Sequence, residues 1–350
     1  MPMCRTRMER KAQEKKPKSF LLESWDMALR IGRSIQLFGK NIELEGEIKT
    51  FHLTLYNAVI PSVLNYEYER YTSLFKSLKL PILTGIDVHG NIFTYDMVDN
   101  LHLLIAGETG SGKSTQVRSV LTSIIQTLSP ERIELYLCDL KRSEFFLFKN
   151  IEHVKGVYQS AREMLPMLQY LQLEMQKRGN QLNQHERSHV DDLPDPPPYI
   201  LLCIDEVALL QDEKEIMKLV EEISAIGRAL GVFLILSMQR SNSKILDGKL
   251  KNNLTVRMGF KCADLINSRI IGTPGSEKLT VKGRMLLKLP IYSKLIEIQA
   301  SYLSVESAKR ILERYKSHKP KKPNKEHLKS FEGVIDLQEL ENNIFGVLDK

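Results

Sequence analysis

The chain has 350 residues, of which 42% are hydrophobic, enough for one large core domain with smaller appendages. No run approaches the roughly 18 consecutive apolar residues of a membrane-spanning helix, and the basic N-terminus lacks the apolar region of a secretory signal. The 4 cysteines form no CxxC pair, which favours reduced core residues in a cytoplasmic protein over a zinc site.

The net charge of +7 is unevenly distributed along the chain. Residues 1–18 and 316–329 are strongly basic, and the last 21 residues are acidic. The block between the two basic segments, residues 19–315, is close to neutral. Basic tails can bind nucleic acid or acidic lipid but are more often solvated linkers, so the basicity alone does not indicate DNA binding.

Composition and pattern predict four parts. Residues 1–18 are expected to be a basic disordered tail, and residues 19–98 a small N-terminal α+β module. Residues 99–315 are expected to form the main domain, and residues 316–350 a basic linker with a short acidic tail that contains one amphipathic helix.

The expected module begins with a helical pattern and continues with two strand signals. Polar and apolar residues partly alternate over 41–57, which predicts strands. Residues 81–98 read as a hairpin, with its turn at 88–91 and Gly90 available for a positive φ.

The main domain alternates apolar strands with helices, which predicts an α/β fold with a mainly parallel sheet covered on both faces. The expected strands are 101–106, 133–139, 199–205, 232–238, 254–260 and 284–289. The expected helices are 114–128, 160–178 and 213–230. A polar, proline-rich surface loop is expected over 179–198.

A phosphate-binding loop is the strongest chemical signal. The sequence GETGSGKS at 107–114 fits G-x-x-x-x-G-K-[ST] between an apolar strand and a helix. Its glycines let backbone amides wrap phosphates, while Lys113 reaches the β- and γ-phosphates and Ser114 ligates Mg²⁺. The predicted nucleotide-binding residues are Gly107, Glu108, Thr109, Gly110, Ser111, Gly112, Lys113, Ser114 and Thr115.

Two acids end the next strongly apolar strand. Asp205 is expected to hold Mg²⁺ opposite Ser114, and Glu206 to polarise the attacking water. Acids that merely cap the following helix are the alternative interpretation. The strand expected at 133–139 implies a sheet with an extra strand between the two nucleotide-binding strands, as in RecA-like motors. The sequence therefore predicts a P-loop nucleoside triphosphatase that uses ATP and Mg²⁺.

Two further strand ends carry polar residues. Gln239 follows the strand 232–238 and is expected to sense the γ-phosphate, with a plain loop amide as the alternative. Asp139 and Lys141 follow another strand, and for these a local salt bridge and a functional role are equally compatible with the sequence.

Together these segments resemble the motor domain of the FtsK/SpoIIIE family of DNA translocases. The resemblance covers about residues 80–310 and is carried by LHLLIAGETGSGKS (101–114), CDLKRSEF (138–145), YILLCIDEVALL (199–210), IGRALGVFLILSMQR (226–240) and TVRMGFKCADLINSRIIG (255–272). It implies a RecA-like core, a homo-hexameric ring, double-stranded DNA in the pore and ATP bound between subunits. It also implies a trans-acting arginine, for which Arg269 is the first candidate and Arg257 the second, with surface or ion-pair roles as the alternative.

Three features depart from the family pattern: no membrane helices, no room for a winged-helix domain, and Leu140 where chromosomal members usually have Pro. By analogy, the chain is similar to short members from mobile elements that act in conjugation or in plasmid or phage DNA transfer. A relaxase, a replication protein or a secretion-channel protein is then the expected partner. Lys244, Lys249 and Lys251 are candidate DNA contacts, with a solvated basic loop as the favoured alternative.

Two other functions remain open. A protein-secretion ATPase would move polypeptides, although such enzymes usually carry several ATPase cores and this chain has one P-loop. A non-translocating adaptor would bind ATP and dock a partner. The presence of Lys113, Asp205 and Glu206 argues against a dead ATPase.

Overall fold

The computed structural model describes residues 18–22, 42–47, 50–55, 60–239, 246 and 248–317. It divides into two compact units, Met1–Pro61 with Ile86–Ile92 and Ser62–Gly85 with Phe93–Lys350, and each is described by itself. The predicted N-terminal tail up to residue 17, the acidic C-terminal helix and Lys244 lie outside the described residues.

The first unit contains a sheet of three antiparallel strands, β1 (Lys18–Leu22), β2 (Ile42–Glu47) and β3 (Thr50–Leu55), in the order β1-β3-β2. The alternating pattern over 41–57 therefore correctly predicted strands. The expected module of 19–98 is divided between the two units, because β4 (Leu64–Asn65), β5 (Pro81–Asp87) and β6 (Ile92–Asp96) belong to the large sheet. The predicted turn forms between β5 and β6, with Gly90 at φ 82°.

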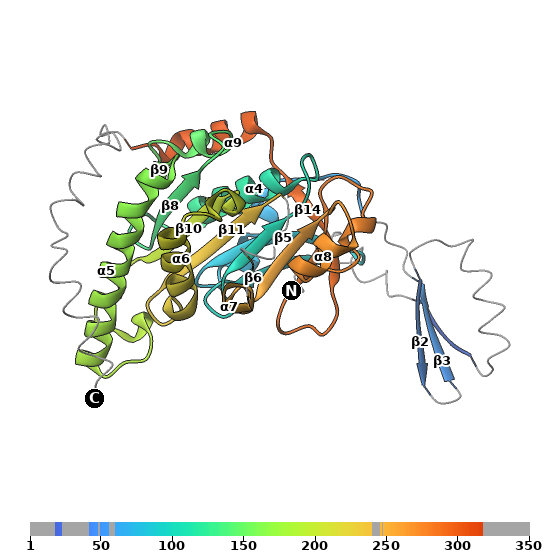
Figure 1. Ribbon diagram of the computed structural model, residues 1–350. Helices are drawn as coiled ribbons and strands as arrows, with labels where there is room; N and C mark the ends of the chain where they lie inside the picture. Colours follow the sequence, from blue (N-terminus) through green and yellow to red (C-terminus); the bar gives the residue numbers. More distant parts are fainter. Residues whose placement is uncertain are drawn as a thin grey trace, which may run out of the picture. The chain divides into compact units, whose positions relative to one another are not determined.

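The large sheet has 11 strands, and its parallel part carries the nucleotide motifs (Figure 1). Its order is β6-β5-β14-β13-β12-β7-β11-β10-β8-β9, with β4 beside β14. The parallel strands are β7 (Leu103–Ala106), β8 (Ile133–Asp139), β9 (Val154–Tyr158), β10 (Tyr199–Asp205), β11 (Val232–Met238) and β12 (Val256–Phe260). Two antiparallel strands, β13 (Arg284–Lys288) and β14 (Ile296–Tyr302), continue the sheet beyond β12. The mainly parallel α/β sheet predicted from the sequence is confirmed.

One detail of the strand order differs from the prediction. A strand does separate the two nucleotide-binding strands, but it is β11, which pairs with both β7 and β10. The strand at 133–139, β8, lies on the other side of β10 and pairs with it from Tyr199↔Ile133 to Asp205↔Asp139. Sequence order alone does not determine which parallel strand lies in the middle, because crossovers can return to either side.

Helices cover both faces of the sheet. Figure 1 shows α4 (Lys113–Thr127) and α9 (Val305–Leu312) on one side, and α6 (Lys214–Ile226) and α7 (Gly248–Asn253) on the other. The remaining helices are α3 (Thr72–Phe75), α5 (Ala161–His185), which packs on α6, and α8 (Leu265–Ile271). None of the helices in the described part of the chain combines the length and apolarity needed to cross a bilayer.

The end of α5 differs from the sequence prediction. The helix continues to His185, so the expected loop at 179–198 is shorter at its start. Met175, Arg178 and Leu182 are all buried, so the inward-facing stripe continues through a segment whose polar composition suggested a loop. The buried Arg178 guanidinium donates to the carbonyls of Leu230 and Pro198, which anchors this extension.

His102 links three elements beneath the nucleotide strands. It is fully buried; its Nδ1 accepts from the Leu234 backbone N–H at 3.0 Å, and its Nε2 donates to the Ser224 carbonyl at 3.1 Å. Burial lowers the pKa of His102 to about 4, and the Ser224 hydrogen bond opposes this only in part. The imidazole is therefore neutral in the folded protein at physiological pH.

We expect His102 to make stability depend on pH. Because its pKa is lower in the folded than in the unfolded chain, stability is lost as pH falls through the range from 6.5 to about 4. Between pH 8 and pH 5 the expected loss is roughly 2 kcal/mol. His102→Gln, which can make similar hydrogen bonds without titrating, should lose less over the same range. Urea unfolding of both proteins at the two pH values measures the difference, and equal losses would exclude this role.

Candidate functional site

The predicted P-loop connects β7 to α4. Gly107 and Gly112 have φ values of 155° and 117°, in the region that favours glycine. A Cβ atom on Gly107 would lie 2.6 Å from the Phe260 Cβ, and one on Gly112 would lie 2.8 Å from the Gly283 Cα. The loop therefore approaches β12 and the start of β13 too closely for any side chain at these two positions.

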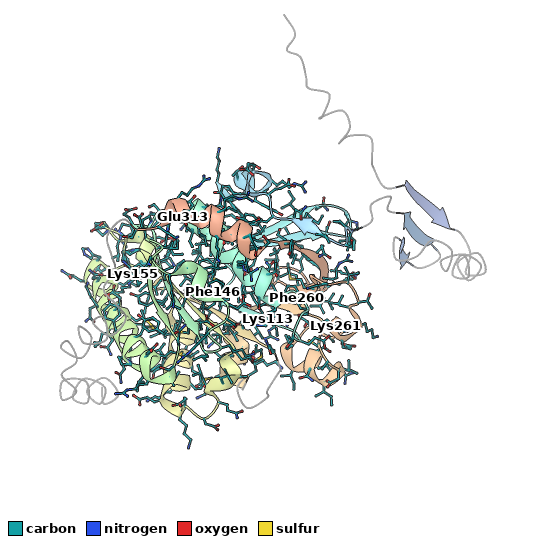
Figure 2. All side chains as sticks on the ribbon, turned by 90° about the horizontal axis from the view of Figure 1, so that it is seen from above. Lys113, Phe146, Lys155, Phe260, Lys261 and Glu313 are labelled. Atoms are coloured by element: carbon teal, nitrogen blue, oxygen red, sulfur yellow. The ribbon has the colours of Figure 1, made fainter. Side chains whose placement is uncertain are left out.

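Lys113 lies inside the second unit, close to Phe260 in the view of Figure 2. Its side chain is 3% exposed, and its Nζ donates to Asp205 Oδ1 at 3.2 Å and to Ser237 Oγ at 2.7 Å. The Ser237 hydroxyl donates to the same Asp205 oxygen at 2.9 Å. The sheet order explains this contact, because β11 carries Ser237 between the P-loop strand β7 and the Asp205 strand β10.

Ser237 was not among the predicted site residues. It lies two residues before Gln239 in a fully buried strand, so in the sequence it cannot be told from an ordinary core serine. The signal for its role is the strand order, which the sequence did not provide.

Glu206 follows β10 in a left-handed backbone conformation, with φ 60° and ψ 60°. Such a conformation costs a residue other than glycine about 1–2 kcal/mol and is concentrated at functional sites. Its Oε2 accepts from Lys141 Nζ at 2.7 Å, and its Oε1 accepts from the Gln239 backbone N–H at 3.0 Å. Asp205 and Glu206 therefore point to different partners, although they are adjacent in the sequence.

Gln239 links Glu206 to the P-loop. Its backbone N–H reaches Glu206, and its side-chain Oε1 accepts from the Thr109 hydroxyl at 3.3 Å. This position, between the P-loop and the acid at the end of β10, is compatible with the predicted sensing of the γ-phosphate.

Two cavities meet at the P-loop. One of about 330 Å³ is lined by Gly110 and Gly112–Thr115 together with Glu108, Thr109, Arg118, Glu144, Gln239 and Lys282. The other, of about 460 Å³, lies between the P-loop and α8 and is lined by Glu108, Thr109, Gln239, Cys262, Ala263, Asn267 and Ile271. The first, which we call the phosphate cavity, is lined by most of the predicted phosphate-binding residues. It is also lined by Arg118 and Lys282, which were not predicted from the sequence.

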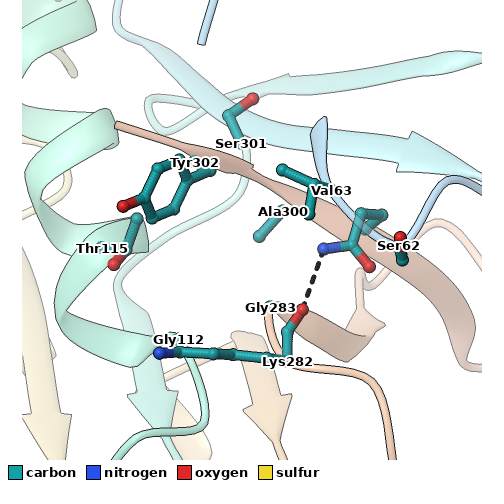
Figure 3. Close-up of a pocket in the computed structure, with 10 residues that line it drawn as sticks. Ser62, Val63, Gly112, Thr115, Lys282, Gly283, Ala300, Ser301 and Tyr302 are labelled. Carbon is teal, nitrogen blue, oxygen red and sulfur yellow. Dashed lines mark hydrogen bonds between the residues drawn. The ribbon is translucent and has the colours of Figure 1, made fainter. Parts of the chain in front are cut away.

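A third pocket, of about 200 Å³, lies beside the N-terminus of α4 (Figure 3). It is lined by Gly112, Thr115, Lys282, Gly283, Ser62, Val63 and the end of β14 from Gln299 to Tyr302. Gly112, Thr115 and Lys282 also line the phosphate cavity, so the two spaces share a wall.

The residues expected to hold Mg²⁺ fit that ion. Ser114 is the first hydroxyl of α4 and lines the phosphate cavity. Both side-chain hydrogen bonds of the buried Asp205 fall on Oδ1, so Oδ2 is the oxygen that would hold the ion or its water. Hydroxyl, carboxylate and phosphate oxygens are the ligands that Mg²⁺ prefers.

The two candidate trans-acting arginines have different environments. Arg257 lies in β12, is 7% exposed, and donates to the carbonyls of Leu254, Ile271 and Lys251. This geometry assigns Arg257 a structural role and argues against the interfacial role considered from the sequence. Arg269 is exposed on α8, the helix that carries Asn267 and Ile271 of the larger cavity, so it remains the better candidate.

Fold and site define a P-loop nucleotide-binding core with a strand inserted between its two nucleotide-binding strands. Residues 72–196 match the model of the FtsK/SpoIIIE family. The DNA translocase FtsK of Borreliella burgdorferi is 33% identical over 252 residues, which cover 68% of this chain and 32% of that protein. The chain therefore belongs to the FtsK/SpoIIIE family of ATPases.

The resemblance extends to other relatives and to solved structures. FtsK of Treponema pallidum is 33% identical over 249 residues, covering 67% of this chain and 31% of that protein. This chain thus spans about a third of the length of these curated relatives. The conjugation coupling protein TcpA of pCW3 shares the fold with a TM-score of 0.66 at 23% identity, over 86% of this chain and 90% of TcpA. The cytoplasmic domain of the type VII secretion ATPase EccC of Thermomonospora curvata has a TM-score of 0.61 at 26% identity, over 70% of this chain and 32% of that structure.

The different environments of the two arginines predict different effects on stability. Arg257→Ala should lower the free energy of unfolding by about 2–4 kcal/mol, because it leaves a cavity and three carbonyls without their donor. Arg269→Ala, at an exposed position, should change it by no more than about 0.5 kcal/mol. Urea denaturation of both variants checks this, and a stable Arg257→Ala protein would remove the structural assignment.

Proposed function

We propose that this chain binds Mg-ATP at Gly107–Thr115, hydrolyses it, and uses the energy to move double-stranded DNA. The observation that carries the hydrolytic part is that the Lys113 ammonium and two consecutive carboxylates, Asp205 and Glu206, lie at the same edge of the sheet. An adaptor that binds ATP without hydrolysing it would not need the carboxylate of Glu206, held in a strained backbone conformation next to the expected metal ligand Asp205.

The proposed reaction is hydrolysis of the bond between the β- and γ-phosphates. Glu206 takes a proton from a water molecule while the water oxygen bonds to the γ-phosphorus. The bond from that phosphorus to the β–γ bridging oxygen breaks, and ADP leaves with the electron pair. Lys113 exchanges Asp205 for the phosphate oxygens and stabilises the charge that develops on them. Ser114 and Asp205 would hold Mg²⁺, which would further neutralise that charge.

The DNA part of the proposal rests on the family. The FtsK proteins of Borreliella burgdorferi and Treponema pallidum carry the name DNA translocase, and TcpA is named as a conjugation coupling protein. We propose a homo-hexameric ring around double-stranded DNA in which Arg269 of one copy reaches the ATP of its neighbour. A partner of the relaxase, replication or secretion-channel kind would then direct the motor to its DNA.

A second candidate function is transport of a polypeptide. The fold similarity to EccC, named as a secretion ATPase, supports it. DNA stimulation of the ATPase separates the two functions.

The deciding experiment measures steady-state ATP hydrolysis with and without linear double-stranded DNA. We expect the wild-type rate to rise several-fold with DNA, and Lys113→Ala to lose nearly all activity because the phosphates lose their buried cation. Arg269→Ala should lower the rate of the assembled ring without weakening ATP binding to the separate chain.

The outcomes of this experiment have separate meanings. An active enzyme that DNA does not stimulate would contradict the translocase function but not the ATPase. Full activity in Lys113→Ala would contradict the site itself. A strictly monomeric, fully active protein in sedimentation with Mg-ATP would leave the role of Arg269 without a basis.

We also propose that the pocket of Figure 3 receives the nucleoside half of ATP. It shares Gly112, Thr115 and Lys282 with the phosphate cavity, and it contains the half-exposed ring of Tyr302 and the exposed side chain of Val63. Two of its polar side chains are already paired: Gln299 with Arg284 and the Lys282 carbonyl, and Ser301 with the Tyr71 hydroxyl. The base is therefore expected to be held mainly by contact with Tyr302 and Val63.

Inorganic tripolyphosphate tests this subsite, because it has the phosphates of ATP without the nucleoside. Tyr302→Ala should weaken ATP binding about tenfold, the usual effect of losing one base–aromatic contact, and leave tripolyphosphate binding unchanged. Tyr292→Ala, which removes an exposed tyrosine outside the pocket, is the matched control. Calorimetric titration gives both affinities, and equal losses for the two ligands would exclude the nucleoside assignment.

A further inference from the structure

The proposed function leaves the ion pair between Lys141 and Glu206 without a role. Lys141 Nζ lies 2.7 Å from Glu206 Oε2, and the side chains are 31% and 5% exposed, respectively. A partly exposed ammonium is thus directed at a buried carboxylate. Pairs between two exposed side chains contribute little, whereas a charge-assisted hydrogen bond to a buried group restrains it.

The position of Lys141 follows from the sheet register. β8 pairs with β10 such that Asp139 lies opposite Asp205, the last residue of each strand. Lys141 is two residues beyond Asp139, and Glu206 is one residue beyond Asp205. The register of these two strands therefore brings the backbone of Lys141 close to that of Glu206.

The segment that carries Lys141 is itself anchored. The Asp139 carboxylate is fully buried and accepts the backbone N–H groups of Ser143, Glu144 and Phe145 at 3.0, 3.1 and 2.9 Å. Arg142, within this turn, adopts a positive φ of 57°. These bonds hold the turn that follows β8 and thereby fix the backbone position of Lys141.

The two donors to Glu206 orient its carboxylate without occupying all of its acceptor sites. Lys141 occupies one site on Oε2 and the Gln239 N–H one on Oε1, while a carboxylate offers about four acceptor sites. Acceptor capacity is left for a water molecule. A general base must hold its oxygen within hydrogen-bond reach of the water, and a displacement of about 1 Å can cost a hundredfold in rate.

The same segment also contacts the phosphate cavity. Glu144, five residues after Asp139, pairs with Arg118 of α4 at 3.1 Å, and both side chains line that cavity. One short anchored turn therefore lines the phosphate cavity through Glu144 and contacts the proposed base Glu206 through Lys141.

We infer that Lys141 is a positioning residue for Glu206: its ammonium holds the carboxylate in the orientation that activates water. This inference rests on the proposed function, because it assumes that Glu206 is the base. It explains why the buried Glu206 has a cationic partner of its own. That partner is Lys141, which follows β8, whereas Asp205 pairs with Lys113.

The test compares four variants in the ATPase assay. Lys141→Met should lower kcat about tenfold to a hundredfold with KM changed less than about twofold, because the lysine acts on the base and not on ATP. Lys141→Arg should recover most of the lost rate, since a guanidinium can still reach one carboxylate oxygen. Lys149→Met removes an exposed lysine further along the same segment and should leave kcat and KM unchanged. Glu206→Gln provides the reference for a missing base.

The affinity for a non-hydrolysable ATP analogue and the thermal midpoint complete the comparison. Both should be unchanged in Lys141→Met, which excludes misfolding as the cause of a lower kcat. A kcat that stays within about twofold of wild type, or that rises, would overturn the inference, as would a loss of ATP affinity with kcat preserved. If Glu206→Gln keeps full activity, the proposed base is wrong. If only Glu206→Gln is inactive, the base stands and the role of Lys141 falls.

Discussion

The burial of the Lys113 ammonium is the constraint on which the rest of the site depends. An ammonium removed from water is costly unless opposite charge and hydrogen bonds replace its hydration. Here Asp205 and Ser237 supply them at 3.2 and 2.7 Å. Because these partners come from β10 and β11, the ion pair forms only when both strands lie in this order beside the P-loop strand β7. Buried ion pairs contribute little net stability compared with apolar packing, so the arrangement is better explained by what it prepares. It keeps a cation at the bottom of the phosphate cavity.

The parallel register carries this constraint to the neighbouring strands. Once β10 is placed by the Lys113 contact, β8 is aligned with it from Tyr199↔Ile133 to Asp205↔Asp139. The two strands then end together, and the turn after β8, anchored by the buried Asp139, delivers Lys141 to Glu206. The polar groups of the site thus lie at one edge of the sheet, as expected for ligands of open α/β sheets. The apolar body of each strand, fully buried in β10 and β11, makes that edge rigid.

The sequence predicted the central strands well because each is a continuous apolar run bounded by polar residues; β8, β10 and β11 have the predicted bounds. It missed β14, although residues 298–301 are all buried there, because Gln299 and Ser301 interrupt the apolar pattern. The P-loop and both acids were recognisable from type and spacing, whereas Ser237, Lys282 and the pairing of Lys141 with Glu206 were not. Their roles depend on which strands become neighbours, and local pattern does not determine strand order. Arg257 was a candidate because it lies on the segment that resembles the family's interface. Only the structure shows that its guanidinium donates to the nearby carbonyls of Lys251, Leu254 and Ile271.

Asp205 and Glu206 place two negative charges on consecutive residues at a buried strand end, and each has its own lysine. The two pairs differ in a way that matters for a nucleotide cycle. Both members of the Lys113–Asp205 pair are buried, so neither charge can be left without a partner. If phosphates draw the ammonium away, Asp205 needs another cation, and the Mg²⁺ that accompanies ATP would be one. The Lys141 pair has one partly exposed member and does not line the phosphate cavity, so nucleotide binding need not break it. If Asp205 holds Mg²⁺ and Glu206 activates water, as proposed, one acid changes its partner while the other keeps its orientation, which separates the two roles at adjacent residues.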